Sequence, residues 1–256
     1  KTRFLPKKWY LNHLVRTLKN YELNAINEVD GIAAITYRDA AFFRGETAIP
    51  VIDIPYGVNP EEFTPSYKIK EKPTLYHIGS MNWMPNEEGI RWFIKNVWDK
   101  LTERNLKIEL NLAGRHMPNW LKKLKKKNIN IIGEVPDAKE FIKDNDIAIV
   151  PLLSGSGIRI KIIEAMAMGK TVITTMVGAE GIQYSEYVNI IIADNPTKIV
   201  EIICRITKEP DELERIGRNA RKLIEDIYDN KKIINRLLIF YNEIKQERKD
   251  ITYINH

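Results

Sequence analysis

The sequence predicts an α/β protein whose main part is a doubly wound parallel sheet, preceded by part of another domain. From about residue 73 to residue 230, short apolar runs alternate with stretches of helical apolar spacing. That alternation is typical of parallel βαβ units. The chain has 256 residues, of which 44% are hydrophobic, so it can build one large domain or two smaller ones.

The first 66 residues predict too few elements for a complete open sheet. The expected elements are a helix at 11–26, short strands at 30–36 and 50–55, and a helix at 37–44 whose N-cap is Thr36. Glycine and proline then mark a structured linker at 56–65. We therefore expect residues 1–66 to be the remnant of a preceding domain together with a linker.

The main part predicts six strands separated by helices. Apolar runs place the strands at 74–79, 107–114, 129–133, 147–152, 171–175 and 189–194. Helical spacing predicts helices at 90–101, 119–127, 138–144, 160–168, 196–207 and 210–227. A last helix is expected at 230–248, and its apolar stripe needs a partner to pack against.

Composition narrows the function classes. The single cysteine, Cys204, excludes an internal disulfide and fits a reducing compartment, so we expect a cytoplasmic protein. No apolar run approaches the roughly 18 residues of a membrane span. No cysteine cluster, HExxH motif or acidic triplet is present, and the histidines lack ligand spacing, so we expect no metal and no cofactor.

The net charge of +6 suits an anionic ligand, although it also fits an ordinary solvated surface. The densest charge run is "KKLKKK" at 122–127, which is either a solvated helix end or a patch for nucleic acid or a membrane surface. Stacking aromatics do not interleave with this run. We therefore expect no nucleic-acid partner and leave peripheral membrane association open.

A cluster of charges follows the strand at 147–152. Ligands of doubly wound sheets bind beyond the carboxyl ends of the strands, where "SGSGIRIKIIE" begins a helix. Gly157 lets the backbone approach a ligand, and the helix N-terminus offers free N–H groups to an anion. Arg159 and Lys161 can bind a diphosphate, and Glu164 can accept hydrogen bonds from a ribose diol. A surface salt-bridge cluster is the competing interpretation.

Two other phosphate motifs do not fit this loop. It is not the GxGxxG of dinucleotide-binding folds, and it lacks the GK[ST] ending of a P-loop. The pattern therefore favours a sugar-nucleotide diphosphate over a dinucleotide or a triphosphate.

Four segments together resemble the group 1 family of retaining glycosyltransferases, which have the two-domain GT-B architecture. The specific one is "SGSGIRIKIIEAMAMGKTVITTMVGAEGI" at 154–182, in which Glu164 matches the second glutamate of the family's paired-glutamate pattern. "GSMNWMPNEEGIRWF" resembles the opening loop of the donor domain, and "IPYGVNPEEFTP" resembles the interdomain linker. "GEVPDAKEFIKDNDIAIVPL" resembles the loop and strand that contact the base.

This resemblance implies three parts. They are an acceptor-domain remnant with its linker at 1–66, a donor domain at 67–230, and a helix at 231–256 that crosses back to the first domain. The implied donor-binding residues are Gly79, Ser80, Val135, Ser156, Gly157, Arg159, Lys161 and Glu164. Trp83, His116 and Glu180 are further candidates near the same cleft, and His77 is expected in the core or near the site.

The sequence departs from the family pattern at one informative position. Ser156 stands where the family has its first glutamate, which contacts the transferred sugar. Arg159 and Lys161 stand where the family more often has glycine and proline, and we expect them to contact the diphosphate instead. No catalytic residue is assigned, because the family's main one belongs to the acceptor domain.

The resemblance implies transfer of a hexose from a nucleotide-diphosphate sugar to a saccharide or lipid-linked acceptor, with retention, in glycan or polysaccharide biosynthesis. The alternative is an inactive fragment or degenerate homologue that acts as a nucleotide-binding module. We expect the chain alone to have negligible transferase activity, because most of the acceptor domain lies outside it.

Overall fold

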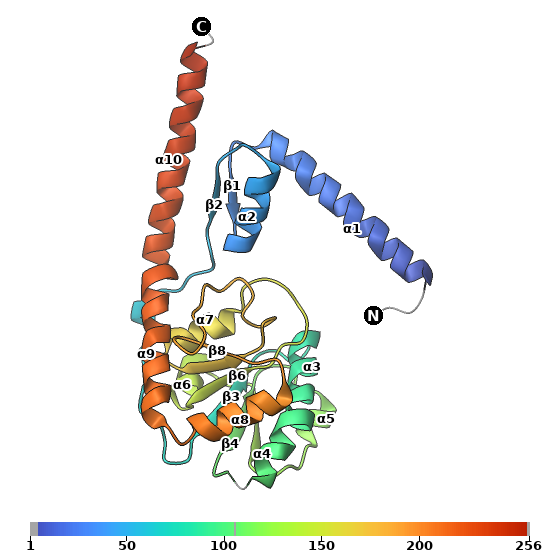
Figure 1. Ribbon diagram of the computed structural model, residues 1–256, viewed down its shortest axis with the longest axis vertical. Coiled ribbons are helices and arrows are strands. Elements are labelled where there is room, and N and C mark those ends of the chain that lie inside the picture. The colour runs from blue at the N-terminus through green and yellow to red at the C-terminus, as the bar shows by residue number, and fades with distance from the viewer. Residues whose placement is uncertain (1–4, 105, 255–256) are drawn as a thin grey trace. The chain divides into compact units, whose positions relative to one another are not determined.

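The structure is a computed structural model that describes residues 5–104 and 106–254, with side chains over 8–104 and 106–246. It divides into two compact units. The smaller unit comprises the residues up to Pro55 and those from Ile234 onward, and the larger unit comprises Tyr56–Ile233. Most elements of both units are labelled in Figure 1.

The smaller unit contains a two-stranded parallel sheet of β1 (Ile32–Ala34) and β2 (Val51–Asp53). Its helices are α1 (Leu5–Ala25), α2 (Tyr37–Glu46) and the later part of α10 (Asn230–Ile254), and a short 3-10 turn spans Ile26–Glu28. The expected cap is present, since the Thr36 hydroxyl accepts a hydrogen bond from the Asp39 N–H at 3.0 Å.

Helix α10 packs closely on this small sheet. A Cβ atom added at Gly31, just before β1, would lie 2.4 Å from Cδ1 of Ile244 and 3.0 Å from the Phe240 ring. Arg236 of the same helix donates to the Asp53 carbonyl at 3.0 Å. Phe240 and Ile244 of α10 therefore pack beside the start of β1 in the same unit.

The larger unit is built on a six-stranded parallel sheet of order β5-β4-β3-β6-β7-β8. The strands are β3 (Thr74–Ile78), β4 (Glu109–Ala113), β5 (Ile129–Gly133), β6 (Ile147–Val150), β7 (Thr171–Thr174) and β8 (Ile191–Ile192). The helices are α3 (Met84–Phe93), α4 (Asp99–Glu103), α5 (Asn119–Lys122), α6 (Ala138–Lys143), α7 (Ile160–Ala167), α8 (Pro196–Ile206) and α9 (Pro210–Ile227), with a π segment at Ile94–Trp98 and a 3-10 turn at Pro60–Glu62.

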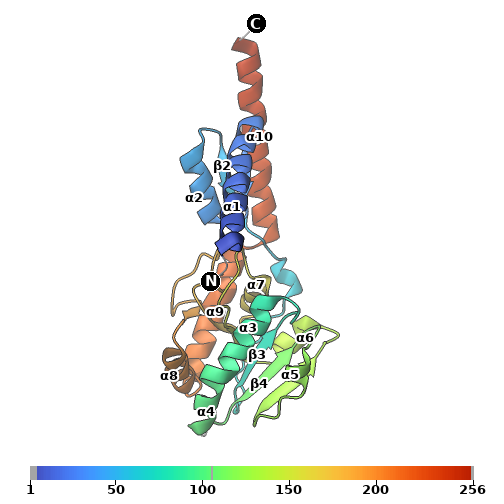
Figure 2. The same cartoon turned by 90° about the vertical axis from the view of Figure 1, so that its right-hand side faces the viewer.

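Helices cover both faces of this sheet, as Figures 1 and 2 show. On one face Leu75, Ile149 and Ile173 pack with residues of α3, α4 and α8. On the other face Tyr76, Val150 and Val172 pack with α6, α7 and α9. Neighbouring strand residues thus point into different cores, because side chains alternate along a strand. The predicted doubly wound fold is confirmed.

The predicted helix at 119–127 is mostly wrong. The helix α5 ends at Lys122, and the chain then turns toward Asn128, whose φ is +60°. Five of the six residues at 122–127 are lysines, whose like charges repel at helical spacing. The segment is also held elsewhere, because the Lys127 carbonyl accepts from the Trp98 indole at 3.3 Å and Lys126 pairs with Asp99.

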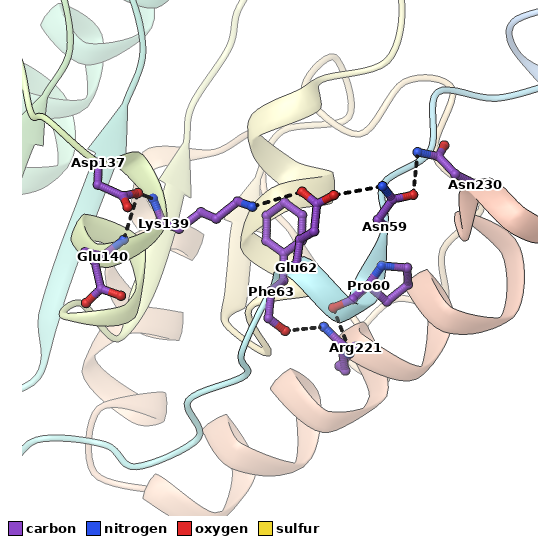
Figure 3. A network of polar contacts seen from close by, with 9 residues as sticks. All are labelled: Asn59, Pro60, Glu62, Phe63, Asp137, Lys139, Glu140, Arg221 and Asn230. Carbon is purple, nitrogen blue, oxygen red and sulfur yellow. Dashed lines mark hydrogen bonds and ion pairs between the residues drawn. The ribbon is translucent and has the colours of Figure 1, made fainter.

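The linker before β3 belongs to the larger unit because it is bonded to α9. Arg221 donates to the carbonyls of Pro60 at 3.0 Å, Phe63 at 2.9 Å and Ala167 at 2.6 Å. Figure 3 shows the first two of these contacts beside Glu62, which accepts from Asn59 and Lys139. Through Arg221 the linker is thereby tied to α9 and to the end of α7.

Candidate functional site

The candidate site lies where the direction of the strand order changes. Strands β4 and β5 extend the sheet from one side of β3, and β6, β7 and β8 extend it from the other. In doubly wound sheets, ligands bind beyond the carboxyl ends of the strands at such a point. The loop after β3 begins at Gly79, and the loop after β6 leads to α7.

Lys161, in the first turn of α7, reaches back to the loop after β3. Its Nζ donates to Oδ1 of Asn86 at 2.6 Å and lies 3.4 Å from Nε2 of His77. A Cβ atom added at Gly79 would lie 2.4 Å from the same Nζ. Glycine at this position thus leaves room for the amine beside the end of β3.

His77 is buried on β3 with a fixed tautomer. Its Nδ1–H donates to the Ile149 carbonyl at 2.8 Å, so Nε2 carries the lone pair that faces Lys161. Burial holds the pKa of His77 well below its usual range, and the neighbouring Lys161 lowers it further, against the opposing effect of the Ile149 bond. The ring is therefore neutral at pH 7.

The pKa of Lys161 falls to about 7. Burial is the main cause, Arg159 adds to it, and Glu164 acts in the opposite direction. Burial also raises the pKa of Glu164, although Lys139 and Lys161 oppose that effect. Glu164 lies on the same helix and is half-buried.

Arg159 stands at the N-cap position of α7 and is only 5% exposed. Its Nη1 donates to the Ser156 carbonyl, whereas Nε and Nη2 are buried and have no hydrogen-bond partner among the described residues. These two N–H groups form one edge of the guanidinium, the edge that binds a phosphate in bidentate fashion. The guanidinium carbon lies 5.4 Å from the centroid of the Trp83 ring.

Burial lowers the pKa of Arg159, and Glu180 opposes this effect. Glu180 lies in the turn after β7, which is fastened to the end of β6. There Thr174 donates to the Val150 carbonyl at 2.7 Å, and Thr175 donates to the Leu152 carbonyl at 2.5 Å. The charge of Glu180 therefore acts on Arg159 from the turn after β7.

The remaining predicted residues are arranged in two groups. Ser80 belongs with Lys161, because its carbonyl accepts from Asn86 Nδ2 at 2.8 Å. Ser156 and Gly157 lie in the loop before α7, and Gly157 has φ +84° with no atom within 4 Å of an added Cβ. Val135 lies after β5, with β4 between its strand and β3, so it is separate from the Lys161 contacts.

A cavity of about 390 Å³ lies at the carboxyl ends of β4 and β5. It is lined by Gly114, His116, Met117, Lys122, Ile131, Gly133 and Glu134. His116 adopts φ +57° there, a backbone conformation uncommon for residues other than glycine. The candidate residue His116 therefore lies at this cavity.

Sequence reasoning missed Asn86 and undervalued His77. Both residues belong to elements with strong apolar patterns, a helix and a strand, so their polarity carries no periodic signal. Asn86 is buried and bridges Ser80 and Lys161. A buried polar residue needs partners, but the sequence does not show which partner the fold supplies.

Two features are absent from the described residues. No group of three or more histidine, cysteine, aspartate or glutamate side chains is placed to hold a metal ion. Within the same residues, no helix has the length and apolar character needed to span a bilayer.

The chain belongs to the family described as glycosyl transferases group 1. The family's model matches residues 72–209, which is more than half of the chain and includes Gly79, Arg159 and Glu164. The resemblance seen in the sequence is thus confirmed at the level of the family.

A relative from Klebsiella pneumoniae is described as an uncharacterized 44.6 kDa protein in the cps region. It is 29% identical over 164 residues, which cover 60% of this chain and 42% of that protein. The chain thus spans less than half the length of this relative.

Solved structures share the fold at low sequence identity. Sucrose-phosphate synthase from Thermosynechococcus elongatus aligns with a TM-score of 0.69 at 17% identity, over 88% of this chain and 61% of that one. Anabaena HepE, solved with UDP and glucose, aligns with a TM-score of 0.69 at 15% identity, over 90% of this chain and 68% of that one. The pneumococcal O-GlcNAc transferase GtfA, solved with UDP and GlcNAc, aligns with a TM-score of 0.66 at 15% identity, over 88% of this chain and 47% of that one.

Proposed function

We propose that this chain carries the donor domain of a retaining glycosyltransferase. The enzyme moves a hexose from a nucleotide-diphosphate sugar to a saccharide or lipid-linked acceptor in polysaccharide biosynthesis. Family membership supports glycosyl transfer, and the location of the Klebsiella relative in a cps region supports a role in polysaccharide synthesis. Solved proteins of the same fold contain UDP, which supports a nucleotide donor.

The observation that carries the proposal is the free edge of Arg159. Two buried N–H donors without a partner cost free energy, about 1–3 kcal/mol each by the penalty for unsatisfied groups. A diphosphate would satisfy both donors at once. Lys161 and the N–H groups of the first turn of α7 would add positive potential on the same side.

In the transfer step a bond forms between an acceptor hydroxyl oxygen and the sugar's anomeric carbon, the bond from that carbon to the diphosphate oxygen breaks, and the hydroxyl proton passes to the leaving diphosphate. Negative charge then grows on the leaving diphosphate, and Arg159, Lys161 and the α7 terminus stabilise it where it develops. Glu164 accepts hydrogen bonds from the ribose hydroxyls and fixes the nucleotide in register. We place the base near Val135 and the cavity at the ends of β4 and β5.

The test compares ligands by calorimetry: UDP, GDP and ADP against their nucleosides. Arg159→Ala should weaken binding of the nucleoside diphosphate about tenfold or more, because a charge-assisted bond contributes roughly 1.5–3 kcal/mol. The same change should affect the nucleoside much less. Glu164→Ala should weaken both about equally.

Circular dichroism must first show that both variants are folded. Binding by either variant that equals the parent would refute the site assignment. A nucleotide located away from residues 154–164 would refute it as well.

A nucleotide-binding module without transfer is the second candidate, favoured by Ser156 at the position of the sugar-contacting glutamate. Tight nucleotide binding by the complete protein, with no turnover of any sugar nucleotide tested, would support that alternative over the enzyme.

A further inference from the structure

Three elements converge on the amine of Lys161. Helix α7 carries the lysine, α3 supplies Oδ1 of Asn86 at 2.6 Å, and β3 supplies Nε2 of His77 at 3.4 Å. Each of these partners is itself fixed. Asn86 Nδ2 donates to the Ser80 carbonyl, and His77 Nδ1 donates to the Ile149 carbonyl.

His77 can only accept from Lys161 in this arrangement. Its single ring proton is on Nδ1 and is committed to Ile149, so Nε2 offers a lone pair. A protonated lysine has three N–H groups, of which Asn86 and His77 take two. The third has no hydrogen-bond partner among the described residues and is available to a ligand.

The charges around Lys161 do not favour its protonated form strongly. Arg159, from the same helix, opposes the ammonium, and Glu164, also from α7, favours it. From β3 the lysine faces the neutral His77, and from α3 it faces the uncharged amide of Asn86. Without a ligand, the buried amine therefore lacks a close compensating anion and has a pKa of about 7.

We propose that His77 is a positioning residue that holds Lys161 for the donor diphosphate, and that Lys161 takes up a proton from solvent when this diphosphate binds. The inference rests on the proposed function, since the ligand is the diphosphate of the donor. Its negative charges supply the counter-ion that the free site lacks, so the pKa of Lys161 rises in the complex. No covalent bond changes in this step.

The coupling between protonation of Lys161 and donor binding makes the affinity depend on pH in a definite direction. Below pH 7, Lys161 is protonated in both the free and the bound site, so the affinity does not change with pH on its account. Above pH 7, the free site is neutral and must gain a proton on binding. The affinity then falls by up to tenfold per pH unit until the pKa of the bound state is reached.

The first measurement is calorimetry with UDP-glucose at pH 8, in two buffers of different ionisation enthalpy. The diphosphate of a nucleotide sugar has no group that titrates near neutral pH, so proton uptake reports on the protein. GDP-mannose and ADP-glucose serve as probes in the same way. We expect uptake of most of one proton by the parent and none at this site by Lys161→Arg, whose guanidinium stays charged.

The second measurement tests His77. His77→Leu replaces the buried ring with an apolar side chain and removes the acceptor for Lys161. UDP-glucose binding should therefore weaken about tenfold, while uridine binding should change less than twofold. A merely structural role of His77 would weaken both ligands alike. Unchanged UDP-glucose binding by a folded His77→Leu would also overturn the positioning role.

The third measurement needs no ligand, so it is independent of the proposed donor site. The Lys161 side chain, labelled with ¹³C at Cε and assigned through Lys161→Arg, is titrated by NMR. A midpoint near 7 is expected, and a midpoint near the ordinary lysine value of about 10.4 would refute the inference even if every nucleotide binds. Conversely, a midpoint near 7 with no nucleotide binding would refute the proposed function and the proton uptake on donor binding, but not the buried amine.

Discussion

At the scale of single residues, Arg159 shows a conflict between stability and ligand binding. A buried arginine with two unbonded donors is less favourable for the free protein than an apolar side chain of similar length. Residues of this kind are retained where a ligand completes their bonds. The conflict can be measured, because it predicts opposite effects on folding and on binding.

We expect Arg159→Met to raise the free energy of unfolding of the ligand-free protein by about 1–2 kcal/mol. The change removes two unsatisfied donors, at the cost of the bond to the Ser156 carbonyl. Urea unfolding measures this difference. A loss of stability would show that the guanidinium is satisfied in solution.

Gly79→Ala should weaken nucleotide-sugar binding by about tenfold while the fold is retained. The added Cβ would lie 2.4 Å from Lys161 Nζ and 2.8 Å from Asn86 Nδ2, so the lysine must move. Calorimetry with the parent and variant measures the change. Gly45→Ala is the matched control, because an added Cβ there meets no atom within 4 Å.

The sequence was informative about residues that break an apolar pattern. Arg159, Lys161 and Glu164 could be found because charges are unexpected in a helix that is otherwise apolar. His77 and Asn86 could not be assigned to the site, because their roles depend on the contact between β3, α3 and α7 rather than on local spacing. Tertiary contacts of this kind leave no periodic trace in a single sequence.

At the scale of elements, one side chain of α9 holds the linker. The Arg221 side chain is 12% exposed and bonds the carbonyls of Pro60 and Phe63 (Figure 3) and also that of Ala167. It also pairs with Glu225 at 2.5 Å. The linker and the end of α7 therefore share one support.

Arg221→Met should lower the free energy of unfolding by about 2–4 kcal/mol, because it leaves buried carbonyls without donors. Arg218→Met is the control on the same helix. Arg218 is half exposed and pairs with Glu214, so its loss should cost less than about 1 kcal/mol. Equal effects of the two changes on urea unfolding would contradict the role of Arg221.

Element prediction succeeded where apolar periodicity was strong and failed where charge dominated. Five of the six strands of the main sheet, β3 to β7, and the helices α7, α8 and α9 lie close to their predicted ranges. The helix expected at 119–127 stops at Lys122. Its residues favour a helix individually, but the lysines that follow repel one another at helical spacing. The strand expected at 189–194 shrinks to Ile191–Ile192, where it pairs with β7 at the sheet edge.

At the scale of the whole molecule, all eight predicted donor-site residues fall in the larger unit. We expect residues 56–233 to fold alone and to bind nucleotide sugar within about twofold of the full chain. Calorimetry and circular dichroism of this segment test the expectation. An unfolded segment would show that the larger unit depends on the smaller one.

The strand order also has a consequence for the time at which the site forms. The bond between His77 and Ile149 joins positions 72 residues apart, and those from Lys161 to Asn86 and His77 span 75 and 84 residues. Closing such long loops costs entropy before any contact compensates for it. On the ribosome, nucleotide capture must therefore await emergence of α7, so a nascent chain that ends before residue 161 can contain β3, β4, β5 and β6 and still be unable to bind its ligand.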